Sequence, residues 1–167
     1  MPWKQVCVLC LALLLFVLTG CGQGAGATDP VSEVEGPSAL AALGLPIDAP
    51  DGAEDVRYST VSDTVAQVEF TFEGRGYCYR ASRDDGDFSG VDEAFADEAL
   101  RLNALYDGYE VEVLIRAPLS GGRLAEWAWE ETRYSLYTAD ELDDDAITSV
   151  SLKLAEASHA AAQQQTV

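Results

Sequence analysis

Positively charged residues are scarce in this sequence. Its 167 residues include 10 lysines and arginines against 29 aspartates and glutamates, which gives a formal net charge of −19 at pH 7. Proteins that bind nucleic acid use Lys and Arg to neutralise phosphates, and proteins held electrostatically on anionic lipid need a basic cluster. The composition argues against both classes. It favours cationic ligands, basic partners or simply high solubility.

Histidine is nearly absent, since His159 is the only one in the chain. Nucleophilic catalysis needs a base near a serine, threonine or cysteine. His159 lies near the C-terminus in an alanine- and glutamine-rich stretch, where we expect an exposed helix-end residue that complements the helix dipole. The sequence also contains no HExxH, no GxSxG and no glycine-rich phosphate loop. We therefore expect that the protein is not an enzyme.

No apolar run is long enough to span a bilayer as a helix, which takes roughly 20 residues. The longest, Val6–Leu18, has thirteen residues behind a short segment that carries Lys4. That length is typical of the apolar region of a signal peptide. The run ends in Leu18-Thr19-Gly20-Cys21, which resembles the lipobox of bacterial lipoproteins. The alternative is an ordinary secretory signal with an incidental cysteine.

The lipobox resemblance implies that residues 1–20 are a signal peptide and that Cys21 is the lipidated N-terminus of the mature protein. Two or more acyl chains, such as palmitate, hold a protein stably on a membrane, at about 0.8 kcal/mol for each buried CH₂. The predicted location is therefore the extracytoplasmic face of the cell membrane, in the cell envelope. Loss of Lys4 with the signal peptide changes the formal charge from −19 to −20.

Cysteine is too scarce for a disulfide framework. Of the four cysteines, Cys7 and Cys10 leave with the signal peptide and Cys21 carries lipid, so Cys78 alone remains in the folded part. It lies between two tyrosines in a strand-like run. We interpret Cys78 as a small buried apolar residue. A reactive thiol or an intermolecular disulfide is the alternative.

The remaining chain divides into three parts. Residues 21–36 are small, polar and acidic, so we expect a flexible tether behind the lipid. Residues 37–158 are enough for one core and are predicted to form a single domain. Residues 159–167 are predicted to be a disordered tail.

Periodicity within 37–158 predicts an α+β fold. A short helix begins at Pro37 and ends near Gly44, with proline at its start and glycine at its end. Alternating apolar residues then predict an antiparallel meander of about six or seven strands, with turns at Glu73–Gly76 and at Asp107-Gly108. Apolar residues recur at helical spacing from residue 147 onward, namely Ile147, Val150, Leu154 and Ala157. The segment Asp92–Glu98 could be helix, strand or loop.

The stretches VAQVEFTFEGRGYCYRAS, DFSG, YDGYEVEVLIRA and RLAEWAWEETRYSLYTA, followed by an acidic-capped terminal helix, resemble a bacterial domain-of-unknown-function family. That family occurs in extracytoplasmic lipoproteins and at the C-termini of anti-sigma-like membrane proteins. The resemblance covers about residues 38–157. It implies a pattern of strands and turns, and it carries no catalytic residues. In this comparison Phe88-Ser89-Gly90 is a structural turn.

One acidic stretch, DDGDFSGVDEAF, has part of the spacing of a calcium-binding loop. Asp85, Asp87 and Asp92 are its candidate metal ligands. The twelfth position is Ala96, where an EF-hand has a bidentate glutamate, and the preceding segment is a predicted strand. The alternative is a solvated acidic turn, with no cofactor in the protein.

Aromatic pairs recur at strand spacing: Trp127 and Trp129, and Tyr77 and Tyr79. Core packing explains them in one interpretation. In the other, they form a face that contacts a protein partner or line an apolar groove for a lipid or small ligand. We expect a non-enzymatic binding or interaction domain that engages an unidentified envelope protein. The alternatives are a small-ligand or lipid-binding module and a weak calcium-binding module.

Overall fold

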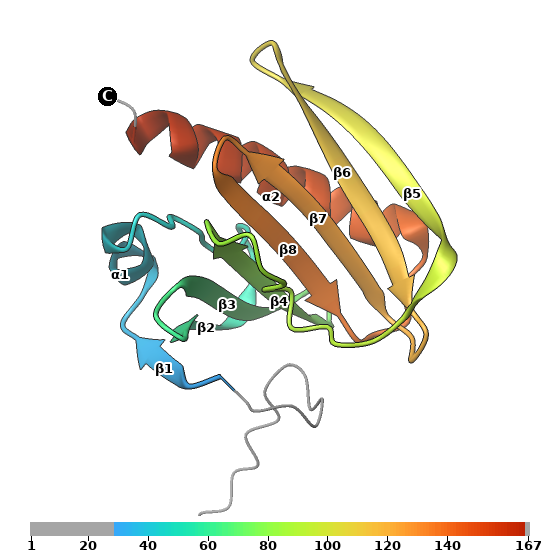
Figure 1. Cartoon of the computed structure of the whole chain (residues 1–167), viewed down its shortest axis with the longest axis horizontal. Coiled ribbons are helices and arrows are strands. Elements are labelled where there is room, and N and C mark those ends of the chain that lie inside the picture. Colours follow the sequence, from blue (N-terminus) through green and yellow to red (C-terminus); the bar gives the residue numbers. More distant parts are fainter. Residues whose placement is uncertain (1–28, 166–167) are drawn as a thin grey trace, which may run out of the picture.

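The fold is one antiparallel sheet with two helices, seen in a computed structural model that describes residues 29–165 (Figure 1). Two helices and eight strands follow in chain order: β1 (Val31–Val34), α1 (Pro37–Ala42), β2 (Glu54–Val61), β3 (Val65–Phe72), β4 (Arg75–Ser82), β5 (Phe95–Tyr106), β6 (Tyr109–Pro118), β7 (Arg123–Trp129), β8 (Thr132–Thr138) and α2 (Asp144–Gln165). The predicted α+β class is confirmed. The described part has eight strands, above the expected six or seven.

The order of the strands across the sheet is β1-β2-β3-β4-β8-β7-β6-β5. The chain therefore forms two four-stranded meanders, and the segment after β4 crosses to the far edge before β5 begins. The last strand of the second meander returns beside β4, with Tyr79 opposite Leu136 and Arg80 opposite Ser135. Because sheets twist, the strands of the two halves run in clearly different directions (Figure 1).

Two local turn predictions are confirmed. β3 and β4 are joined at Glu73-Gly74, and β5 and β6 at Asp107-Gly108. In each pair both residues have positive φ, at 52° and 77° and at 50° and 85°. This is the backbone of a tight hairpin turn that matches the strand twist, and glycine adopts it without steric cost.

Both ends of the described chain are more ordered than the sequence predicts. Val31–Val34, expected within the tether 21–36, pairs with β2 from Val31 opposite Val61 to Val34 opposite Tyr58. Its side chains are mostly exposed, so the pairing rests on backbone hydrogen bonds and leaves no apolar pattern. Residues 21–28 of the tether, the signal peptide and Cys21 lie outside the described residues.

The predicted disordered tail 159–167 is wrong in its described part. Helix α2 continues through His159 to Gln165, because the alanine and glutamine residues there favour a helix and His159 itself is buried. The acidic segment Asp92–Glu98 divides between a loop and the start of β5 at Phe95, opposite Pro118. The pairing is irregular between Phe95 and Ala99.

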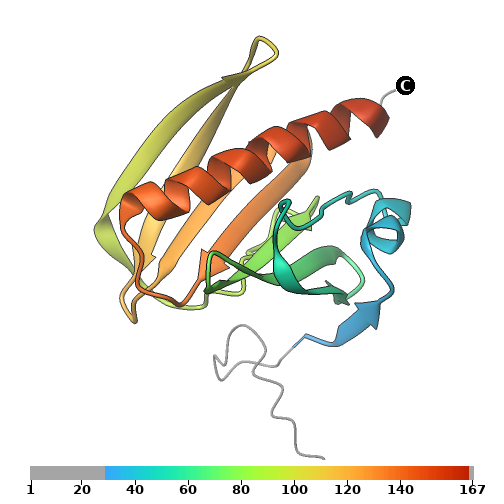
Figure 2. The same cartoon turned by 180° about the vertical axis from the view of Figure 1, so that it is seen from behind.

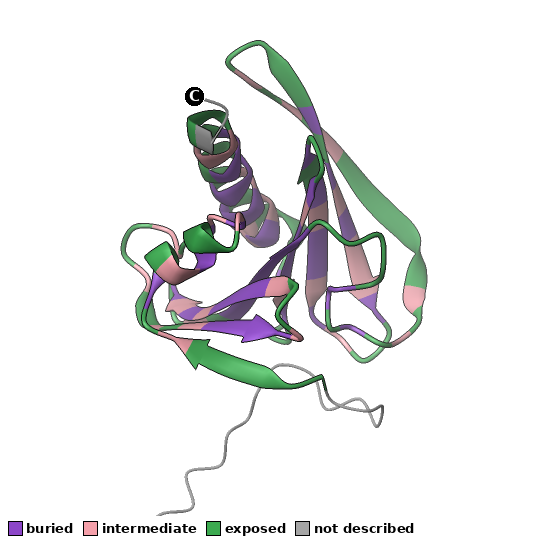
Figure 3. Ribbon diagram, turned by 60° about the vertical axis from the view of Figure 1, so that its left-hand side comes forward, coloured by how far each residue is buried: buried purple, intermediate pink, exposed green. Residues whose placement is uncertain are grey.

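The core lies between the sheet and α2. Figure 2 shows α2 running across one face of the sheet, where it packs against β5, β6 and β7. Ile147, Val150 and Leu154 face the sheet and are buried, as their helical spacing predicts. Figure 3 shows the same division, with the buried side of α2 turned toward the strands. Each such side chain contributes about 1.5–3 kcal/mol by leaving water.

Neither of the two helices in residues 29–165 has the length and apolar character needed to cross a membrane.

Candidate functional site: a groove between the two helices

The two tryptophans of β7 belong to the core. Trp127 and Trp129 are 4% and 7% exposed, and both indole N–H groups donate to α2. Trp127 Nε1 donates to Ser158 Oγ and Trp129 Nε1 to the carbonyl of Ala155, each at 3.0 Å. Buried indoles need such acceptors, because an unsatisfied donor is costly. The interpretation of this pair as core residues is confirmed. The alternative, a face at these two residues that contacts a protein partner, does not agree with their burial.

Tyr77 and Tyr79 are buried on the same side of the sheet. Tyr77 stacks on Phe70, with ring centroids 5.4 Å apart, and Tyr79 stacks on Trp127 at 5.8 Å. Burial raises the pKa of the Tyr79 hydroxyl well above its ordinary value, and a hydrogen bond with Ser158 lowers it by less. These tyrosines therefore do not form an exposed face either. Of the four predicted aromatic residues, Tyr79 alone lines the groove described next.

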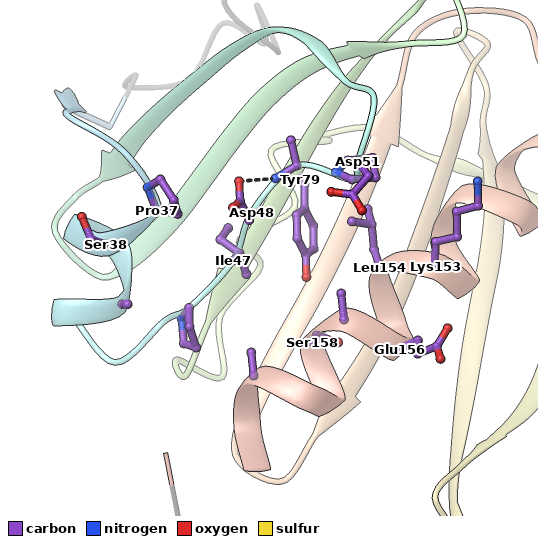
Figure 4. A pocket seen from close by; sticks show the side chains of 16 residues that line it. Pro37, Ser38, Ile47, Asp48, Asp51, Tyr79, Lys153, Leu154, Glu156 and Ser158 are labelled. Atoms are coloured by element: carbon purple, nitrogen blue, oxygen red, sulfur yellow. Dashed lines mark hydrogen bonds between the residues drawn. The ribbon is translucent and has the colours of Figure 1, made fainter. Parts of the chain in front are cut away.

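A groove lies between the two segments that pack on this face of the sheet, helix α2 and the segment 37–51. Helix α2 forms one wall, α1 and the segment 46–51 form the other, and Tyr79 contributes to the floor (Figure 4). Its volume is about 670 Å³, within the range of small-molecule sites. The lining is mainly apolar and comes from Pro37, Ala41, Pro46, Ile47, Ala49, Pro50, Leu154, Ala157 and Ala161, with the polar residues Ser38, Asp48, Asp51, Lys153, Glu156 and Ser158.

The groove exists because two separate segments, α2 and residues 37–51, pack side by side on one face of the sheet. Gly44, with φ of 78°, ends α1 and turns the chain back along the sheet, where Leu45 and Ile47 are buried. On α2, small residues face this segment. Ala157, expected in the core from its helical spacing, is exposed and lines the groove. An alanine there lets the two walls stay apart without filling the space.

One acid on the wall is held in place. Asp48 Oδ1 accepts a hydrogen bond from the backbone N–H of Ala49 at 2.8 Å and another from the Tyr58 hydroxyl. Burial, followed by this bond and the charge of Asp48, raises the pKa of Tyr58 to about 12. The tyrosine therefore stays protonated and keeps donating at neutral pH.

Ser158 connects the groove to the core. Ser158 is one of the lining residues, and its hydroxyl accepts from Trp127 Nε1 and donates to the carbonyl of Ala155 at 2.9 Å. A molecule in the groove would therefore lie one hydrogen bond away from a tryptophan in the core. The sequence alone does not indicate this arrangement, because Ser158 is an ordinary helix residue until the fold places it over β7.

The predicted metal ligands do not converge. Asp85, Asp87 and Asp92 are exposed, and no group of three or more His, Cys, Asp or Glu side chains within residues 29–165 could hold a metal ion. Asp87 Oδ1 instead accepts from the backbone N–H and the hydroxyl of Ser89, at 3.0 and 2.8 Å. The acidic stretch is thus a turn stabilised by its own side chains. The prediction that these three aspartates converge as calcium ligands is wrong.

An arginine that the sequence does not mark as a site residue, Arg80, is buried beneath that turn. Arg80 is 9% exposed; its Nε donates to Gln67 Oε1 at 2.8 Å and its Nη1 to the carbonyl of Phe88 at 3.1 Å. The chain lies so close that a Cβ on Gly90 would be 2.2 Å from Nη1. Alternation along β4 places Arg80 on the side of the sheet opposite Tyr79. The loop after β4 covers it.

His159 is also buried, at 5% exposure, contrary to the expected exposed helix end. Its ring lies 4.4 Å from Trp129 and 5.4 Å from Tyr109, measured between centroids. The long β5–β6 hairpin reaches past the other strands (Figure 1), and Tyr109 beside its turn contacts His159 in the last two turns of α2. This long-range contact, which α2 alone cannot show, places the histidine inside. Cys78 is buried, as predicted.

Comparisons of the chain with protein-family models, with curated proteins and with solved structures gave no match. The groove is therefore interpreted from its own residues.

Proposed function

We propose that the protein is a lipid-anchored lipoprotein of the cell envelope whose extracytoplasmic domain binds a small, mainly apolar ligand in the groove between α2 and the segment 37–51. The groove itself carries this proposal. It has the volume of a small-molecule site, and its walls are largely apolar with a few polar groups at the edge. No chemical step is part of the proposal, and the expectation that the protein is not an enzyme is kept.

The proposed location of the protein rests on its sequence. The apolar run Val6–Leu18 and the sequence Leu18-Thr19-Gly20-Cys21 support lipidation at Cys21 and a location on the extracytoplasmic face of the membrane. The high negative charge supports an absence of nucleic-acid binding. Loss of membrane association in a Cys21→Ala variant would test the anchor, and unchanged association would contradict it.

A blocking substitution tests the groove. In Ala157→Trp an indole would occupy the groove, whereas Ala160→Trp places the same indole on α2 at an exposed residue that is not part of the lining. The readout is the fluorescence of Nile red, an uncharged dye that brightens in apolar sites. We expect strong enhancement with the original protein and with Ala160→Trp, and loss with Ala157→Trp. Equal enhancement with both variants would contradict the proposal.

The first expectation from the sequence, a protein–protein interaction domain, remains a second candidate because of one feature. The tip of the β5–β6 hairpin exposes Leu105 and Tyr109, at 71% and 57%, beyond the rest of the sheet (Figure 1). Exposed apolar residues at a projecting tip are typical of contact sites. The partner would be an envelope protein.

In-cell crosslinking of the lipidated protein, followed by mass spectrometry, tests this second candidate. We expect one dominant envelope protein that is lost in Leu105→Asp. The matched control is Leu119→Asp, because Leu119 is equally exposed, at 70%, but lies in the turn at the other end of β6. A crosslinking pattern that does not change in Leu105→Asp would contradict it.

A further inference from the structure

The charges around the groove are unbalanced. Three of its lining residues are acidic, Asp48, Asp51 and Glu156, and Lys153 is the one basic residue among the described residues that line it. Asp48 and Asp51 belong to the wall opposite α2, three residues apart in one segment. Figure 4 shows both on the segment that forms this wall of the groove. A ligand in the groove would therefore meet carboxylates at its edge.

The one lysine among the described lining residues contacts an aromatic ring. Its ammonium lies 5.1 Å from the centroid of the Phe72 ring, a cation–π contact outside the groove lining. Figure 4 shows Lys153 and Glu156 extending from α2 away from α1. Within the described lining, three carboxylates thus stand against one ammonium, and two of the three belong to the segment opposite α2.

Asp48 is also preorganised. Both of its hydrogen bonds, from Ala49 and Tyr58, end on Oδ1. The carboxylate of this lining residue is therefore held by two hydrogen bonds. A fixed carboxylate binds a cation without first losing side-chain freedom, which improves affinity.

We propose that the ligand of the groove is a cationic amphiphile, an apolar chain or ring that carries a protonated amine. This inference rests on the proposed function and specifies the ligand class of the same groove. The apolar part lies along Ile47, Leu154 and Ala157, and the ammonium lies against Asp48 and Asp51. The field of a chain with net charge −19 attracts the same ligands over longer distances and repels fatty acids and other anionic amphiphiles.

Three probes of equal chain length test the inference: decylamine, decanol and decanoate, each below its micelle concentration. Their binding to the mature chain, residues 21–167 with Cys21→Ser so that no lipid is attached, is measured by titration calorimetry. Two carboxylates near one ammonium predict that decylamine binds about tenfold or more tightly than decanoate. In Asp48→Asn/Asp51→Asn we expect most of this preference to disappear. The control Asp84→Asn/Asp85→Asn, which removes the same charge from an exposed loop, should keep it.

The two tryptophans of the mature chain show where a probe binds. The Trp127 indole N–H is bonded to Ser158, which lines the groove, whereas the Trp129 indole is bonded to Ala155, which does not. In nitrogen–proton correlation spectra we expect decylamine to shift the Trp127 indole signal more than that of Trp129. A larger shift of Trp129 would place the binding elsewhere and overturn the inference.

The outcomes separate the two proposals. Equal affinity for all three probes, with the Trp127 signal moving, would overturn the charge inference and leave the groove as an apolar site. Tighter binding of decanoate would also overturn it. If no probe binds and neither indole signal moves, both the ligand class and the proposed function are contradicted.

Discussion

Replacing Ser158 by alanine should destabilise the protein, because the Ser158 hydroxyl is hydrogen-bonded to Trp127 and to Tyr79. Ser158 is 2% exposed, and Trp127 Nε1, whose residue is 4% exposed, donates to its hydroxyl at 3.0 Å. Alanine leaves the indole N–H buried without that acceptor, which costs about 1–3 kcal/mol. Alanine also favours a helix over serine by roughly 0.5 kcal/mol. We therefore expect a net loss of about 0.5–2.5 kcal/mol, most of that range lying above 1 kcal/mol, or a fall in Tm of roughly 2–8 °C.

A double-mutant cycle isolates the bond. Urea unfolding followed by circular dichroism gives the free energy of unfolding for Ser158→Ala, Trp127→Phe and the double variant. Because Trp127→Phe removes the donor, we expect a coupling of about 1 kcal/mol between the two changes. Tyr106→Phe is the control. The Tyr106 hydroxyl donates to the carbonyl of Leu152 on the same helix at 2.8 Å, so its effect should add to that of Ser158→Ala.

A cost below about 0.5 kcal/mol for Ser158→Ala, together with no coupling to Trp127→Phe, would refute the reasoning. It would mean that the buried indole finds another acceptor and that the α2 wall of the groove is not held by this bond. Coupling of the same size to Tyr106→Phe would point instead to a general loosening of α2.

Three further changes test other parts of the fold. Gly122→Ala should lower the free energy of unfolding, measured with urea, clearly more than Gly74→Ala. Both glycines have positive φ, which costs about 1–2 kcal/mol for alanine. A Cβ at Gly122 would also lie 2.2 Å from the carbonyl oxygen of Thr138, whereas a Cβ at Gly74 would have nothing within 4 Å. Equal costs would contradict this packing. Burial raises the pKa of Tyr134 to about 12 from its ordinary 10.0, so its contribution to stability is complete below pH 10 and is lost between pH 10 and 12. When Tm is measured across that pH window, it should therefore fall less steeply with pH in Tyr134→Phe than in the original protein. An equal slope of Tm against pH would argue against the raised pKa. Arg80→Ala removes the hydrogen bond from the guanidinium to the Phe88 carbonyl in the loop after β4, so trypsin should cut that loop faster after Arg83; an unchanged rate would show that the arginine does not hold it.

Much of the local structure follows from short stretches of sequence. The Asp107-Gly108 pair predicts its hairpin because only a few residue types accept two successive positive φ angles. The helical spacing of Ile147, Val150 and Leu154 predicts which side of α2 is buried. These predictions hold because each depends on the conformation or exposure of neighbouring residues alone.

The misplaced residues are those whose surroundings come from distant segments. Alternation along β4 correctly separates Tyr79 from Arg80, but it cannot show that the loop after β4 covers the second face. His159 is buried because the β5–β6 hairpin reaches the end of α2. β1 was missed because an edge strand with exposed side chains is held by its backbone alone.

The sequence by itself determined the fold class, the hairpins, the buried side of α2 and the strong negative charge. Each of these is set by local backbone preferences, by the period of apolar residues or by composition. Only the tertiary structure decided that β8 returns beside β4, that the acidic turn closes on itself and that a groove remains between α2 and the segment 46–51. A groove is the space left between two covers of one sheet, and its existence depends on how far apart long-range pairing holds them.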